Sequence, residues 1–217
     1  MICMKRFIVI NKQHIYNQPM KKLSTYLFLV LFSFSAPSFA DDIRDFQIEG
    51  MSVGDSLLDY VSEHQIKTNK KDYTYKNDKF YAIDFDNIIS SKIYDGIGIS
   101  LKKNDKKYLI HSIYGVIFYQ NNIHDCYKKK DSIVEELNTL FKDVKIDDQG
   151  TYPSGADPSG KTKTTSIWYN FEFSEGTIGV LCQDWSKEFE KEKGWTDNLR
   201  VSIRSEEFRY WINNEAY

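Results

Sequence analysis

The chain has 217 residues, and five of its 29 lysines and arginines but none of its 31 acidic residues fall within residues 1–40. The rest of the chain therefore has a net charge of −7, which argues against nucleic acid as a partner, because such binding depends on neutralising phosphates. The same charge argues against binding to an anionic membrane surface.

A secretory signal peptide is predicted at residues 20–40. Two lysines follow its methionine, residues 27–32 form an apolar run, and small residues ending with Ala40 precede Asp41. The apolar run is shorter than the ~20 residues of a membrane span. We therefore expect cleavage between Ala40 and Asp41, export to the periplasm, and no membrane attachment afterwards.

This prediction divides the chain into two parts. Residues 1–40 are an N-terminal extension with a cleaved signal peptide, and residues 41–217 are one globular domain, within the usual size of a domain. Met20 with its two lysines resembles a bacterial start, so residues 1–19 are counted with the extension. A lipoprotein would carry a cysteine at the cleavage point, where this sequence has none.

Two cysteines, Cys126 and Cys182, follow the predicted cleavage point. An even number of cysteines in an oxidising compartment predicts a disulfide. Closing a loop of about 57 residues would stabilise the fold by ~4 kcal/mol in the chain-entropy model. The alternative is a free catalytic thiol at Cys126 beside His124.

Hydrophobic periodicity predicts the secondary structure. We expect a first helix that begins with a capping box, then a strand, a hairpin of two strands and an amphipathic helix. The ranges are 53–66 for the first helix, 80–85 for the strand, 97–101 and 108–119 for the hairpin, and 125–142 for the second helix. Residues 67–79 read as an exposed connection.

The second half begins with residues 147–163, the clearest loop of the sequence. A second hairpin, an exposed charged segment, a last strand and a closing helix capped by Ser205 follow. The ranges are 167–173 and 177–182 for the hairpin, turning at Glu175-Gly176, 186–194 for the charged segment and 199–203 for the strand. The closing helix should turn Phe208, Trp211 and Ile212 inward.

This order predicts an α+β fold. It would contain one antiparallel sheet of five to six strands with helices packed on one face. Because both halves run helix, strand and hairpin, a duplicated α-β-β-β unit is a further hypothesis.

Residues 155–162, Gly-Ala-Asp-Pro-Ser-Gly-Lys-Thr, match the phosphate-binding P-loop pattern letter for letter. That loop works only between a buried strand and the N-terminus of a helix. Here polar residues precede it and a strand-like alternation follows it. We therefore interpret it as a surface loop and expect no nucleotide there.

No other pattern identifies a catalytic or cofactor site. His64, His111 and His124 lack the spacing of metal ligands, and no hydrolase signature is present. Residues 84–87 suggest calcium but lack the glycine and distal glutamate of a calcium loop. Lys128-Lys129-Lys130 is expected to be a solvated helix face, with a basic patch for an acidic partner as the alternative. We expect neither metal nor cofactor.

Residues 42–58, Asp-Ile-Arg-Asp-Phe-Gln-Ile-Glu-Gly-Met-Ser-Val-Gly-Asp-Ser-Leu-Leu, resemble the start of an uncharacterised family of small exported proteins from AT-rich bacteria. Residues 126–130 and 199–203 fit the same resemblance, which implies export but no known activity. Gly50-Met51-Ser52 before a helix is also similar to small envelope-assembly lipoproteins of the SmpA/OmlA type.

The expected function is therefore that of a non-enzymatic binding or interaction domain of the periplasm. Its partner would be an envelope protein or a small ligand. The alternative is an unrecognised envelope hydrolase that acts on a small ester, sugar or peptide bond.

Overall fold

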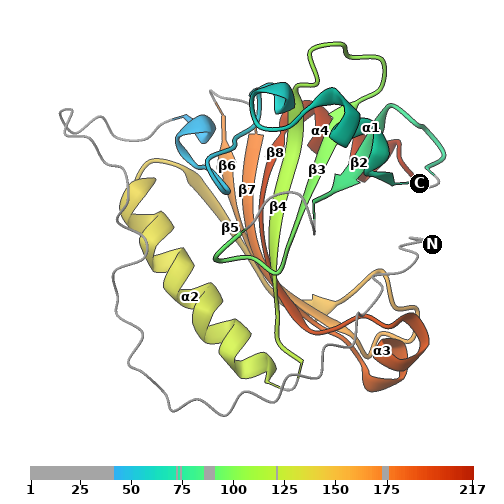
Figure 1. Ribbon diagram of the computed structural model, residues 1–217. Helices are drawn as coiled ribbons and strands as arrows, with labels where there is room; N and C mark the ends of the chain where they lie inside the picture. The colour runs from blue at the N-terminus through green and yellow to red at the C-terminus, as the bar shows by residue number, and fades with distance from the viewer. Residues whose placement is uncertain (1–41, 72, 74, 86–90, 121, 173–175) are drawn as a thin grey trace.

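Each half of the chain supplies four strands to one antiparallel sheet. The computed structural model describes residues 42–71, 73, 75–85, 91–120, 122–172 and 176–217. Their strands are β1 (Lys70–Lys71), β2 (Phe80–Asp84), β3 (Gly96–Lys102), β4 (Ile110–Phe118), β5 (Lys145–Pro153), β6 (Lys163–Phe171), β7 (Gly176–Asp184) and β8 (Asn198–Ser205). The strand order is β1-β2-β3-β4-β8-β7-β6-β5 (Figure 1).

The described helices precede, separate and follow these strands. They are the 3₁₀ turns η1 (Ile43–Asp45) and η2 (Leu57–Asp59) and the helices α1 (Glu63–Thr68), α2 (Ile123–Leu140), α3 (Lys187–Lys193) and α4 (Glu206–Asn214). The first half runs from α1 into β1, β2, β3 and β4, and the second from α2 into β5, β6 and β7 and then through α3 into β8. The last strands of the two halves, β4 and β8, pair at the centre of the sheet. Each half therefore has one strand more than the predicted α-β-β-β order, and the duplication stays a hypothesis.

The α+β class and the antiparallel sheet are confirmed, but the sheet has eight strands rather than five to six. The largest omission is β5, which occupies part of the predicted loop 147–163. It is an edge strand exposed along nearly its whole length, so it carries no alternation of apolar residues. Its pairing with β6 shifts between Asp148 and Gly150, where Gly150 has φ 58°. Such a bulge protects an edge strand.

The predicted helix 53–66 is wrong over its first part. Gly54 has φ 90°, which an α-helix cannot contain, and the chain forms only the turn η2 before α1 begins. The true capping box is at Ser62, whose side chain accepts the N–H of Gln65. Similarly, the charged segment 186–194 contains α3, which Ser186 caps and Gly194 ends at φ 69°.

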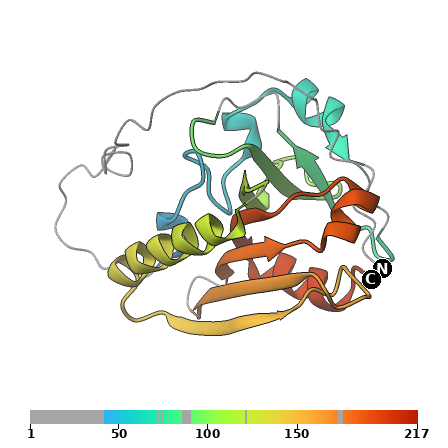
Figure 2. The ribbon, with the colours of Figure 1, turned by 90° about the horizontal axis from the view of Figure 1, so that it is seen from below.

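One face of the sheet is apolar and carries the main core. On β8 this face presents Leu199, Val201 and Ile203, and the adjacent strands add further isoleucines and valines. The helix α2 packs on this face, against β7 and β8, and the segment containing η1 and η2 covers it further along (Figures 1 and 2). Burial of this surface supplies the main driving force for folding.

The helix α4 lies on the opposite face, behind β3 in the view of Figure 1. Its Phe208 and Trp211 pack on Phe80, a β2 residue that points away from the main core. The prediction that all helices pack on one face is therefore wrong. The inward positions of the closing helix were predicted correctly: Phe208 and Trp211 are buried, and Ile212, which is partly buried, packs against them. They cover a second, smaller core.

Candidate functional site

The second face of the sheet is polar where α4 does not cover it. On β8 this face presents Asn198, Arg200, Ser202 and Arg204, which alternate with the apolar residues of the main core. Buried hydroxyl-bearing residues of the neighbouring strands share it. They are Ser100, Ser112, Thr164, Ser166 and Thr177. We call this surface the polar face.

Two glycines let aromatic rings lie flat on the polar face. Gly98 faces the ring of Tyr114, and Gly179 faces the indole of Trp168; a Cβ at either glycine would lie within 2.3 Å of the ring. The register places both pairs in one row across β3, β4, β8, β7 and β6, with Ser202 between them. A side chain at these glycines would displace the rings.

An arginine lies over each of these rings. The guanidinium carbon of Arg200 is 4.8 Å from the ring centre of Tyr114, and that of Arg204 is 4.6 Å from the ring of Trp168. Cation–π contacts of this kind orient a guanidinium plane. The backbone, the ring and the guanidinium therefore form two three-layer stacks, one on each side of Ser202.

Among the described residues, the two guanidinium groups have no acidic partner. No carboxylate of a described residue forms an ion pair with Arg200 or Arg204. Burial, together with the positive charge of Arg200, lowers the pKa of Arg204 to about 10. Two partly buried positive charges without a counter-ion are costly, so this part of the face favours a negative group.

Four buried polar atoms of the polar face lack a hydrogen-bond partner within the described part of the chain. They belong to β7 and β8: Thr177 Oγ1, Asn198 Oδ1, Arg200 Nε and Ser202 Oγ. Thr177 is 3% exposed and Ser202 is 1% exposed, so bulk water does not supply the hydrogen bonds that their hydroxyls lack. Buried polar groups are nearly always paired, and such a cluster is a candidate site for a ligand.

A carboxylate lies at the margin of the polar face. Asp84 is buried, and its pKa is raised by burial, an effect that the ammonium group of Lys71, 3.5 Å away, partly opposes. The hydroxyls of Tyr73 and Tyr114 also lie within 3.5 Å of its carboxylate. Asp84 therefore helps to hold the ring of Tyr114 over Gly98.

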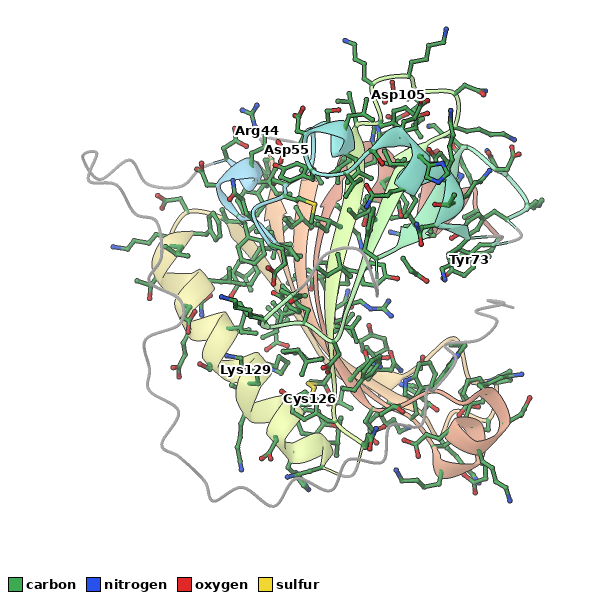
Figure 3. All side chains as sticks on the ribbon, viewed as in Figure 1. Arg44, Asp55, Tyr73, Asp105, Cys126 and Lys129 are labelled. Atoms are coloured by element: carbon green, nitrogen blue, oxygen red, sulfur yellow. A yellow bond between two sulfur atoms is a disulfide. The ribbon has the colours of Figure 1, made fainter. Side chains whose placement is uncertain are left out.

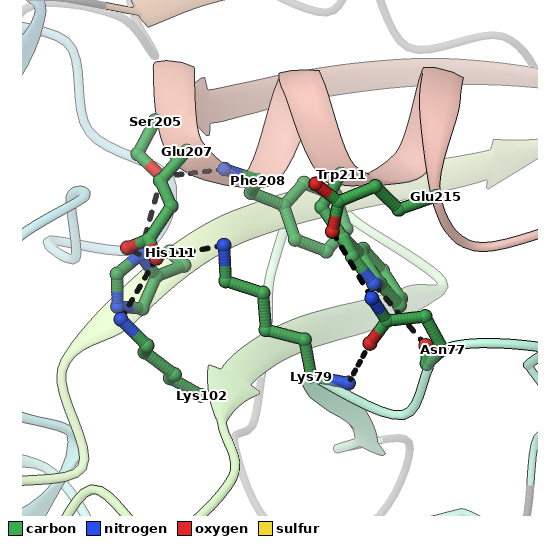
Figure 4. A network of polar contacts seen from close by, with 9 residues as sticks. All are labelled: Asn77, Lys79, Lys102, His111, Ser205, Glu207, Phe208, Trp211 and Glu215. Atoms are coloured by element: carbon green, nitrogen blue, oxygen red, sulfur yellow. Dashed lines mark hydrogen bonds and ion pairs between the residues drawn. The ribbon is translucent and has the colours of Figure 1, made fainter.

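At the α4 end of β8, a polar network surrounds His111 (Figure 4). Ser205 Oγ is 3.2 Å from His111 Nδ1, and a Glu207 oxygen is 3.7 Å from the same nitrogen. Glu207 also binds Lys79 and Lys102 at 3.1 and 2.7 Å. Burial lowers the pKa of His111.

This network does not have the geometry of a hydrolytic triad. A triad places the nucleophile and the carboxylate on the two different nitrogens of the imidazole, so that one orients the ring while the other reacts. Here both approach Nδ1. Ser205 Oγ also accepts the N–H of Phe208 as the N-cap of α4. The network therefore fixes α4 on the sheet.

The predicted disulfide joins Cys126 of α2 to Cys182 of β7, with a Cα–Cα distance of 6.1 Å (Figure 3). Neither cysteine is thus a free thiol, and the exposed His124 has no catalytic cysteine beside it. The bond ties α2 to the apolar face, opposite the polar face. The predicted cleavage point, Ala40 and Asp41, lies outside the described residues.

The P-loop-like segment is the connection between β5 and β6. Its amides bind its own Asp157: the N–H groups of Ser159 and Thr162 donate to that carboxylate at 2.9 and 3.2 Å. Hydrogen bonds from the Ser159 and Thr162 side chains, and to a smaller extent those from the two amides, lower the pKa of Asp157. Lys161 reaches Glu188, 3.0 Å away. The donors that would cradle a phosphate are already used, as expected for a structural loop.

The lysine run on α2 is only partly solvated. Lys128 is exposed, as predicted, but Lys130 is buried and pairs with Asp131 at 2.7 Å.

Within the described ranges, no group of three or more His, Cys, Asp or Glu side chains could hold a metal ion. In the same ranges no helix is long and apolar enough to cross a membrane.

Sequence reasoning identified the last strand but not its two arginines as site residues. The signal was present: Arg200 and Arg204 fall on the face opposite Leu199, Val201 and Ile203 in a strand at the centre of the sheet. A positive charge on a central strand requires a partner. Only the structure shows that no partner is supplied within the described chain.

A scan of protein-family models, a search of curated proteins and a search of solved structures each found no match to this chain.

Proposed function

We propose that this chain is an exported binding domain of the periplasm and that a small ligand occupies the polar face of its sheet. The observation that carries the proposal is the cluster of unpartnered groups on β7 and β8. Ser202 and Thr177 are more than nine-tenths buried, yet their hydroxyls bind no described residue. A ligand with polar atoms would complete these bonds.

Binding is favoured over hydrolysis by the arrangement of the possible catalytic groups. Ser205 and Glu207 both approach Nδ1 of His111, and Lys79 and Lys102 neutralise the glutamate. Cys126 is in a disulfide, so it is not a nucleophile. The unpartnered atoms lie on the strands, at Ser202 and its neighbours, rather than around this histidine.

Export is supported by the pattern of residues 20–40 and by the disulfide, since disulfides persist mainly in oxidising compartments. An N-terminal sequence of the protein purified from the periplasm should begin at Asp41. Recovery of the unprocessed chain from the cytosol would contradict this part of the proposal.

Native mass spectrometry of the periplasm-purified protein tests ligand binding directly. We expect a non-covalent mass adduct that is lost in Ser202→Trp, in which a large side chain fills the polar face. Lys128→Gln, on the opposite side of the sheet, should retain the adduct.

A thermal-shift screen of neutral and charged small molecules complements this test. No adduct and no stabilising compound, together with turnover of an ester, sugar or peptide substrate that is lost in His111→Ala, would contradict the proposal and favour the hydrolase.

A further inference from the structure

The polar face combines two features. It presents two guanidinium groups that have no acidic partner among the described residues, and each lies over an aromatic ring. An arginine that only fills space needs no such support. The stacks indicate that the direction of the N–H groups of Arg200 and Arg204 matters.

The rings themselves are not free to bind a ligand. Tyr114 lies between Gly98 and the guanidinium of Arg200, and Trp168 lies in the same way between Gly179 and Arg204. Both faces of each ring are therefore in use. What remains available is the edge of each guanidinium, whose parallel N–H groups match the two oxygens of a carboxylate or phosphate.

The positions of the two stacks set the size of the ligand. The ring of Tyr114 lies over Gly98 of β3, on one side of β8, whereas the indole of Trp168 lies over Gly179 of β7, on the other side. The two rings that carry the guanidinium groups are thus about three strand spacings, or about 14 Å, apart. One small anion cannot bind both edges over such a distance.

Between the two stacks the polar face offers one hydroxyl group. Ser202 stands in the row that joins the stacks, whereas Thr177 lies two residues away from that row on β7, beside Arg204. The hydroxyl of Ser202 is buried and has no partner among the described residues. It can bind a polar atom in the middle of a ligand whose ends lie at the arginines.

We infer that the ligand of the polar face is a small dianion, with one oxyanion group held by Arg200 and the other by Arg204. This inference rests on the proposed function, because it names the chemical class of the ligand for the same site. The two oxyanion groups are carboxylates or phosphates separated by a short chain, and the hydroxyl of Ser202 contacts that chain.

Calorimetric titration with linear dicarboxylates from malonate to pimelate, and with linear bisphosphonates of the same chain lengths as a second arm, tests the inference. The mature protein is used, and sodium chloride keeps the ionic strength constant. We expect affinity to reach a maximum at one chain length, and acetate to bind at least tenfold more weakly than the best dicarboxylate. Saturation by the bisphosphonates alone would identify the oxyanion groups as phosphate-like and would equally support the inference.

Variants locate the binding. Arg200→Gln and Arg204→Gln should each weaken the best dianion at least tenfold, and Arg204→Lys should do so too, because lysine keeps the charge but not the paired N–H groups. Arg44→Gln is the matched control, since its guanidinium already pairs with Asp42 and lies outside the polar face. Thermal unfolding of each variant without ligand shows that it is folded.

Two results would overturn the inference. One is equal affinity for dianions in the folded arginine variants and in the control. The other is the absence of dianion binding while a neutral compound binds and is blocked by Ser202→Trp. In the second case the proposed function would stand, and only the chemical class of the ligand would be wrong.

Discussion

The two faces of one strand, β8, serve opposite purposes. Leu199, Val201 and Ile203 are buried among the apolar side chains of the main core. Arg200 and Ser202 point the other way, where charges and hydroxyls lack described partners. The apolar face stabilises the fold, whereas the polar face costs stability. Groups that cost stability and are nevertheless present are the basis on which we propose that the polar face binds a ligand.

The disulfide should give the largest effect on the apolar face. Replacing Cys126 and Cys182 together by serine removes the bond between α2 and β7, and we expect a loss of up to ~4 kcal/mol in the free energy of unfolding. Urea denaturation measures it. At temperatures where the variant is folded, its affinity for a polar-face ligand should differ from that of the wild type by less than about threefold. A factor of three corresponds to about 0.65 kcal/mol of binding free energy. A tenfold change in affinity would show that the two faces are coupled.

Adjacent residues of β8 provide the sharpest test of the comparison. Ile203→Ala should destabilise the protein by about 3 kcal/mol, because it opens a cavity in the main core. Ser202→Ala should leave stability unchanged or raise it by up to about 1 kcal/mol, because its hydroxyl is buried without a described partner. Both are measured by urea denaturation without ligand. A loss above about 1 kcal/mol in Ser202→Ala would mean that its hydroxyl has a structural partner.

The smallest expected effect is a change in the pH dependence of stability at Asp84. Burial raises the pKa of this carboxyl, so between its unfolded and folded pKa values the folded state binds more protons than the unfolded state. The contribution of Asp84 to stability therefore falls as the pH rises above about 4. Asp84→Asn removes this dependence. The free energy of unfolding of the variant should therefore increase relative to that of the wild type as the pH rises from 4 to 7.

Asp143→Asn, at an exposed position after α2, is the control for general charge effects. A constant difference between Asp84→Asn and the wild type over this pH range would show that Lys71 and the two tyrosines fully compensate the burial of the carboxylate. In that case the burial of Asp84 would not lower the free energy of unfolding.

The sequence by itself determined the α+β class, the hairpins, the amphipathic helix α2 and the disulfide. These depend on local periodicity, as in Ile97, Ile99 and Leu101, or on the even number of cysteines that follow the predicted cleavage point, and both are visible in the sequence. Export and the chemical class of the ligand stay predictions that the experiments above address.

The tertiary structure alone decided which polar residues form a site. The edge strand β5 shows no alternation of apolar residues because neither of its faces is buried. The predicted first helix does not form at Gly54 because this residue has a positive φ. The stacks of Gly98, Tyr114 and Arg200 bring together residues from three strands and both halves of the chain. No local pattern encodes such contacts, because they depend on the register between strands that are distant in the sequence.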